Sequence, residues 1–209
     1  NGIAVAKDGT IYASQTGSAD GATPQRIYKV TADGKSSVFI EGALFYGALA
    51  FVALHVHQRF GLSLGASGSV AAVFAAGGLL FAAAAGRLLP RFGEIGLVMG
   101  GGGLMTLGFL GLAAAPAPGW AIPCVVALGT GIYMMHNTLQ VHATQMAPAT
   151  RGAALALFAC SLFTGQSAGV WLASHAVDAA GARPVFVAAA IGLLLLALDF
   201  RRRLRHRGS

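Results

Sequence analysis

Four polar side chains in otherwise apolar stretches are the residues of this sequence best suited to chemistry. Asn137 and Gln140 lie three residues apart near the end of one apolar run, a spacing that places both on one face of a helix. Gln166 lies in the middle of another such run, and Glu41 opens the first one. Polar residues inside a membrane span are costly and often mark the path of a solute or ion. For the amides two interpretations are open: they line a solute path, or they form hydrogen bonds between helices.

Motifs of enzymes and of metal sites are missing from the sequence. It contains no C-x-x-C, H-E-x-x-H or G-x-S-x-G motif and no P-loop. His55 and His57 are two residues apart, so they do not share a face of a helix. We therefore predict no enzyme activity, no catalytic residue, no cofactor and no metal site.

The composition indicates a protein of the membrane. The chain has 209 residues, of which 56% are hydrophobic and 10% charged, with a net charge of +7. A soluble domain carries about 25% charged residues. No Asp, Glu, Lys or Arg occurs in 60–86, 95–150 or 152–177, and a helix needs about 20 apolar residues to span a bilayer. These values exclude a soluble enzyme and a disordered chain, and they predict the lipid bilayer as a partner.

The apolar stretches must supply the helices that position the polar residues. We predict an all-α membrane protein with six transmembrane helices over 41–200, followed by a basic cytoplasmic tail over 201–209. Glycines four residues apart, such as Gly165 and Gly169 or Gly96 and Gly100, favour close approach between helices. The six helices are expected at 41–57, 66–87, 94–115, 120–140, 151–174 and 184–200.

Arginines predict the orientation in the membrane. The connections between successive predicted helices lie alternately on the two sides of the membrane. Those on one side carry Arg59 and Arg183, whereas those on the other side, together with the tail, are far richer in arginine. The positive-inside rule then places both termini in the cytoplasm, at a bacterial inner membrane. The tail has no aromatic residues between its arginines, so nucleic acid is not a predicted partner. The cytoplasmic arginines are expected to be Arg87, Arg91, Arg151, Arg201, Arg202, Arg203, Arg205 and Arg207.

Residues 1–40 have a different character and predict about four short β-strands. Asp-Gly turns separate alternating apolar runs, which is typical of hairpins. The sequence of this segment resembles one blade of a lactonase-like or NHL-type β-propeller. Within this resemblance, Asn1 is similar to a metal-binding Asn of the calcium-dependent lactonases. A propeller needs about four to eight blades, so this fragment alone is not expected to form one. The strands are expected at 2–6, 10–14, 26–30 and 35–40.

The connection at 86–93 carries a second resemblance. Its residues Gly86, Arg87, Arg91 and Gly93 stand in the order G-R-L-L-P-R-F-G. This is similar to the G-x-L-x-D-R-x-G signature of the major facilitator superfamily, with Pro90 in place of the aspartate. In that family the signature lies between the second and third helices of a six-helix half and acts in gating. The alternative is that the arginines only fix the topology.

Two further segments resemble the same superfamily. Residues 146–154 are similar to its connection between the tenth and eleventh helices, and 165–169 to its eleventh helix. The resemblance covers about 41–207. It implies the C-terminal six-helix half of a twelve-helix secondary transporter, which moves a small solute by alternating access. It also implies a role for Glu41 in proton coupling, against the alternative of an interfacial acid.

Such a half implies a partner, and other origins of the chain are also open. The partner is a missing N-terminal half or a second copy of the chain. The switch in character near residue 40 also fits a chimeric or incomplete gene product. One alternative function is a fragment of a calcium-dependent propeller lactonase or hydrolase fused to membrane helices. Another is a six-helix membrane scaffold that transports nothing.

Overall fold

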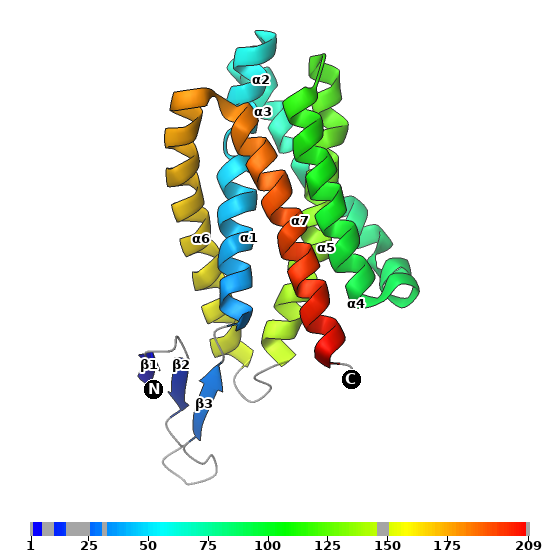
Figure 1. The fold of residues 1–209 in the computed structure, drawn as a ribbon. Helices are drawn as coiled ribbons and strands as arrows, with labels where there is room; N and C mark the ends of the chain where they lie inside the picture. The colour runs from blue at the N-terminus through cyan, green and yellow to red at the C-terminus, as the bar shows by residue number, and fades with distance from the viewer. Residues whose placement is uncertain (1, 6–10, 16–25, 31–32, 146–150, 208–209) are drawn as a thin grey trace.

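The computed structural model describes residues 2–5, 11–15, 26–30, 33–145 and 151–207. Asn1 and the connection at 146–150, both of which carry sequence resemblances, lie outside the described residues. The described elements form a helical bundle and a small sheet (Figure 1). They are β1 (Gly2–Val5), β2 (Ile11–Gln15), β3 (Arg26–Val30), α1 (Asp33–Leu49), α2 (Val52–Phe60), α3 (Leu64–Ala72), α4 (Phe74–Ala114), η1 (Pro118–Trp120), α5 (Ala121–Gln145), α6 (Arg151–Ala180) and α7 (Ala182–Arg207).

The N-terminal sheet differs from the expectation of about four strands. Its three described strands pair antiparallel in the order β1-β2-β3. The residues expected to form a fourth strand, 35–40, belong instead to helix α1. Val38 is 3% exposed and packs in the core of the helical bundle. Burial against other helices therefore overrides the local β-pattern at this position.

The prediction of six membrane helices is also wrong. Among the described residues, five helices are long and apolar enough to cross a membrane. The difference lies at 88–93, where a loop was expected but the helix continues through Pro90, so that Leu64–Ala114 counts as one 51-residue stretch. The five candidate spans are Ser37–Phe60, Leu64–Ala114, Pro118–Val141, Gly152–Ala180 and Ala182–Arg203.

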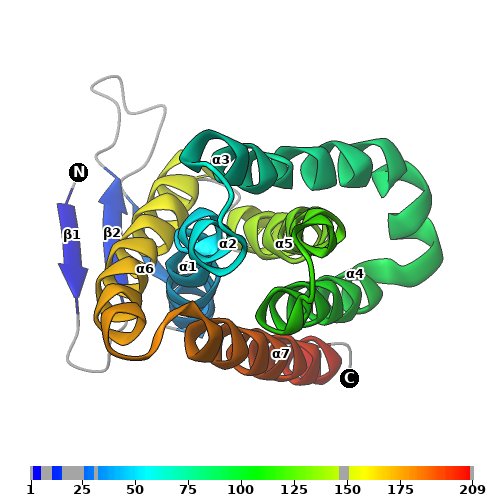
Figure 2. The same cartoon turned by 90° about the horizontal axis from the view of Figure 1, so that it is seen from above.

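Helix α4 changes direction at Gly93. This glycine has φ 62° and ψ −178°, outside the helical region, whereas α4 is otherwise helical. The teal-green part of α4 turns back at the edge of the bundle, so that the residues before and after Gly93 form two arms (Figures 1 and 2). Only glycine adopts this backbone conformation without strain. The turn therefore depends on the residue type at position 93.

The bundle is held together by an aromatic core and by close helix contacts. The Phe45 ring lies 5.8 Å from that of Phe109, which stacks on Phe186 at the same distance, so α1, α4 and α7 meet there. At the end of the bundle where α2 lies, the Arg59 guanidinium donates two hydrogen bonds of 3.1 and 3.0 Å to the Ala115 carbonyl. This links α2 to the end of α4.

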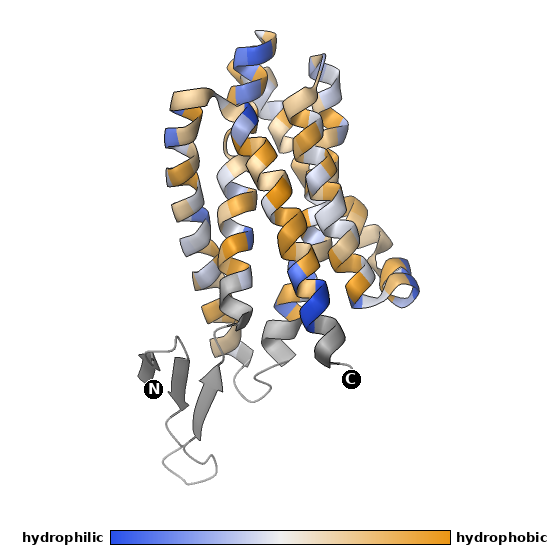
Figure 3. Cartoon of the chain, viewed as in Figure 1, coloured by the Kyte–Doolittle hydropathy of each residue, from blue (hydrophilic) through white to orange (hydrophobic). Residues whose placement is uncertain are grey.

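The outside of the bundle is apolar. Figure 3 shows hydrophobic residues along the helices and hydrophilic ones at the lower end of α7 and at the top of α2. Leu79 is 72% exposed, Leu107 67% and Trp171 63%. Large apolar side chains so widely exposed are unfavourable in water and favourable in lipid. The chain is therefore an integral membrane protein.

Helices α1 and α6 approach each other through glycine. A Cβ added at Gly169 would fall on the backbone of Ala43, and one added at Gly165 would fall on the backbone of Phe39. The predicted close-approach role of these two glycines is confirmed. Gly96 and Gly100 do not play that role, because a Cβ at either position would meet only side chains, those of Phe92 and Met134. On α4, Gly77, Gly101 and Gly108 each face the backbone of α5 instead.

We expect Gly169→Ala to destabilise the bundle by about 1–3 kcal/mol, because the added methyl group overpacks the contact between α1 and α6. The measurement is thermal unfolding of the purified protein in detergent. Gly103→Ala is the matched control, since a Cβ there meets nothing within 4 Å. A helical Gly→Ala change at an open site should leave stability unchanged or raise it by about 0.5–1 kcal/mol. Equal effects of the two substitutions would contradict the close contact.

We expect Gly93→Ala to lower stability by about 1–3 kcal/mol, because alanine is strained at this backbone conformation. Gly86→Ala, seven residues earlier in the same signature, is the control. Gly86 lies in the helical part of α4, and a Cβ there meets nothing within 4 Å. Denaturant unfolding of both variants measures the difference. The turn would be misassigned if Gly93→Ala were as stable as Gly86→Ala.

Candidate functional site

A carboxylate and an imidazole meet inside the bundle. Glu41 Oε2 on α1 lies 3.2 Å from His136 Nδ1 on α5, the distance of a hydrogen bond from the ring N–H to the carboxylate. The side chain of Glu41 is 0% exposed and that of His136 is 18% exposed. Glu41 is therefore fully enclosed by protein, and its only described polar partner is a side chain that binds a proton itself.

The surroundings of the pair are largely apolar. The His136 ring packs edge-on against Phe158 of α6, with 5.0 Å between ring centroids. Within the described part of the chain, Glu41 Oε1 has no hydrogen-bond partner. A buried polar atom without a partner is costly, and it calls for a functional explanation.

Helix α1 also contacts α6 through the glycine next to Glu41. A Cβ added at Gly42 would overlap the carbonyl of Leu162 and lie 3.1 Å from the backbone nitrogen of Gln166. Helix α6 therefore lies directly against α1 at the level of Glu41. Glu41 itself shares the core face of α1 with the buried Phe45 and Ala48, and it meets α5 through His136.

The predicted amides lie in different places. Gln166 is half-buried on α6, with its backbone nitrogen against Gly42. Asn137, adjacent to His136 on α5, lines a cavity of about 400 Å³ between α5 and the two arms of α4. Gln140 is half-buried on the same helix but is not among the residues that line this cavity. The spacing of Asn137 and Gln140 thus does not bring both amides to one described site.

The signature segment lies at the turn of α4. Gly86 lines the same cavity as Asn137, while Arg87 and Arg91 are exposed. The Arg91 guanidinium lies 5.6 Å from the centroid of the Phe92 ring, a cation–π contact. Gly93 provides the change of direction described above. These four residues form a surface turn with one edge on a cavity.

His136 is the partner of Glu41 that the sequence did not reveal. The two residues are 95 positions apart in the chain. The only signal was that both are ionisable residues in or beside long apolar stretches, which marks each separately as a candidate. Among the described residues, no group of three or more His, Cys, Asp or Glu side chains lies close enough to hold a metal ion.

Comparison with known proteins assigns the family. The model of the Major Facilitator Superfamily matches residues 36–208, which includes every described helix except the first turn of α1. Among curated proteins, none matches this chain. The match gives no support to the propeller-blade resemblance of residues 1–40. Five apolar helices, an apolar exterior and this match together lead to one conclusion: the chain belongs to the Major Facilitator Superfamily, a superfamily of membrane transporters.

Proposed function

We propose that this chain is part of a secondary active transporter that couples the movement of a small solute to protons, and that Glu41 and His136 bind the coupling proton. The observation that carries the proposal is the enclosed contact between Glu41 Oε2 and His136 Nδ1. An ionisable residue inside the membrane domain of a transporter is a functional candidate by default, because burial of a charge there is expensive.

The chemistry of the pair suits reversible proton binding. With one proton shared, the pair is neutral overall, either as carboxylate with imidazolium or as carboxylic acid with imidazole. A second proton, or the loss of the first, leaves a net charge within the bundle, which is unfavourable unless water or a charged solute enters. Access of solute and of protons to the site is thereby linked. The unpartnered Oε1 atom supports this, since it leaves a position for a proton or a solute donor.

Gln166, Asn137 and Gln140 are proposed to lie along the solute path. Gln166 is included because its backbone lies against Gly42, the residue next to Glu41. Asn137 follows His136 in the chain, on the side of α5 that lines the cavity. The signature residues Gly86, Arg87, Arg91 and Gly93 are proposed to act in gating, through the turn that they form between the two arms of α4.

The arginines support an orientation with both termini in the cytoplasm of a bacterial cell, at the inner membrane. The turn of α4, the end of α7 and the beginnings of α1 and α6 lie at the same end of the bundle (Figure 1). Arg87, Arg91 and Arg201 belong to this end, whereas Arg59 and Arg183 belong to the other. Positive charge is retained on the cytoplasmic side of membranes.

Alternating access requires two domains that move against each other around the site. We propose that the partner domain is an N-terminal transporter half or a second copy of this chain. Wide exposure of apolar side chains on α6, such as Phe163 and Trp171, is consistent with such a neighbour.

We expect Glu41→Gln to abolish proton coupling while leaving solute exchange intact, because glutamine keeps the size of the side chain but binds no proton. The protein is reconstituted into vesicles and screened with radiolabelled sugars, amino acids, carboxylates and amines. A pH gradient should drive accumulation by the wild-type protein but not by Glu41→Gln. Exchange of labelled for unlabelled solute at equal concentrations should persist in both.

Asp178→Asn serves as the control, since it removes an exposed carboxylate near the end of α6. Infrared difference spectra recorded between two pH values provide a readout that needs no solute. A carboxyl C=O band should be absent from Glu41→Gln and present in Asp178→Asn. Accumulation by Glu41→Gln at the wild-type level, or an unchanged infrared spectrum, would contradict proton coupling through Glu41.

A further inference from the structure

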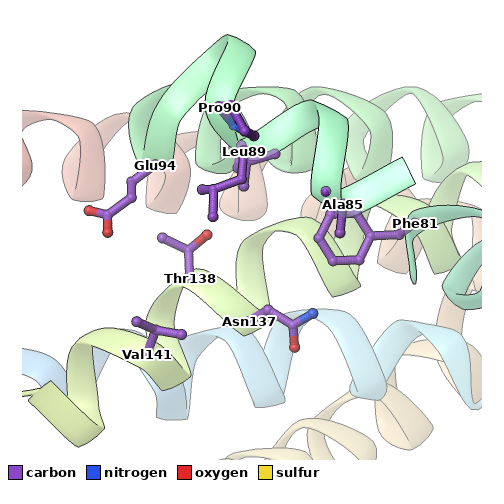
Figure 4. A pocket seen from close by; sticks show the side chains of 10 residues that line it. Phe81, Ala85, Leu89, Pro90, Glu94, Asn137, Thr138 and Val141 are labelled. Atoms are coloured by element: carbon purple, nitrogen blue, oxygen red, sulfur yellow. The ribbon is translucent and has the colours of Figure 1, made fainter. Parts of the chain in front are cut away.

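A second site lies in the cavity between α5 and the two arms of α4. Its volume of about 400 Å³ lies within the range of small-molecule sites, about 300–1,000 Å³. Figure 4 shows Leu89 and Pro90 on one side of the space and Asn137, Thr138 and Val141 of α5 on the other. Neither Glu41 nor His136 lines it. The cavity is therefore distinct from the proton-binding pair and is built wholly from this chain.

The walls are apolar, with a few polar groups on them. The apolar side chains of the lining are those of Phe81, Ala85, Leu89, Pro90, Leu97 and Val141. A molecule that fills this space must therefore present mainly hydrocarbon surface, because burial of unpaired polar atoms against such walls is unfavourable.

The polar groups differ in their availability. The Thr138 hydroxyl already donates a 3.0 Å hydrogen bond to the Met134 carbonyl. Glu94 also has an interaction partner of its own. The Asn137 amide makes no hydrogen bond to any described residue, although it can both donate and accept. One uncharged donor–acceptor group is thus available in the cavity.

We propose that this cavity binds a small lipophilic solute that carries one uncharged hydrogen-bonding group, an alcohol or an amide, paired with Asn137. Charged solutes do not fit, because the described lining offers no cationic side chain and its one carboxylate already has a partner. The inference rests on the proposed solute path, to which Asn137 belongs, but not on proton coupling, since the cavity and the Glu41–His136 pair share no residue. Binding is expected with or without a partner domain.

Photolabelling of the purified full chain in detergent tests the site. The probe is 3-azioctanol, an aliphatic alcohol whose diazirine attaches to neighbouring residues on illumination. Mass spectrometry should locate adducts on 81–97 and 137–141, and excess 1-octanol should remove them. Asn137→Leu should weaken the apparent affinity about two- to tenfold, as expected for the loss of one neutral hydrogen bond.

Two variants make the test specific. Thr164→Leu is the control, because it also replaces a polar side chain with leucine, at an exposed position of α6 outside the cavity. It should leave labelling of the cavity unchanged. Ala85→Leu narrows the cavity from α4 and should reduce labelling even where Asn137 is intact. Thermal unfolding of each variant confirms that the fold is retained.

Three outcomes would overturn the proposal. The first is labelling that does not saturate and is spread over all lipid-facing helices, which would indicate simple partitioning. The second is equal labelling of Asn137→Leu and Thr164→Leu. The third is loss of the cavity adducts when the protein is moved from detergent into phospholipid nanodiscs, because a bilayer lipid would then be the occupant instead of a free solute.

Discussion

The enclosure of one carboxylate among apolar helices is the constraint on which the rest of this structure depends. Glu41 has no exposed surface, and only His136 offsets the cost of its burial with a described polar contact. A buried ionisable pair rarely adds to stability, since the loss of hydration offsets most of the attraction. Its presence in the core of the bundle therefore points to function. In a member of a transporter superfamily, the function that we propose for the pair is the binding and release of a proton.

Glycine contacts hold in place the helix that carries this carboxylate. Gly42, Gly165 and Gly169 allow the backbones of α1 and α6 to touch. In a bilayer, lipid solvates apolar side chains as well as protein does, so helices associate through close packing of small residues. These contacts fix α1 within the bundle, and the core face of α1 carries Glu41 together with the buried Phe45 and Ala48.

Much of the membrane character could be predicted from composition, whereas the pairing of residues could not. The gaps in charge indicated membrane helices, and the spacing of Gly165 and Gly169 indicated a helix contact. The predicted number of membrane helices was wrong because the connection at 88–93 is helical up to Gly93. The predicted strand at 35–40 was wrong because Val38 packs into the helical bundle, a long-range effect that the local alternation of residues does not record. The Glu41–His136 contact joins positions 95 residues apart, and no local pattern reports on such a distance.

The shared proton is tested most directly by nitrogen NMR of the protein labelled with [15N]histidine. The ring nitrogens of His136 report their protonation and hydrogen bonding, and His136→Phe identifies their signals. The account predicts that Glu41→Gln shifts the Nδ1 signal of His136. It also predicts no change for His175, whose Nδ1 lies 2.8 Å from the Trp171 carbonyl on α6, away from the pair. Identical His136 signals in the wild-type protein and in Glu41→Gln would contradict a proton-sharing pair.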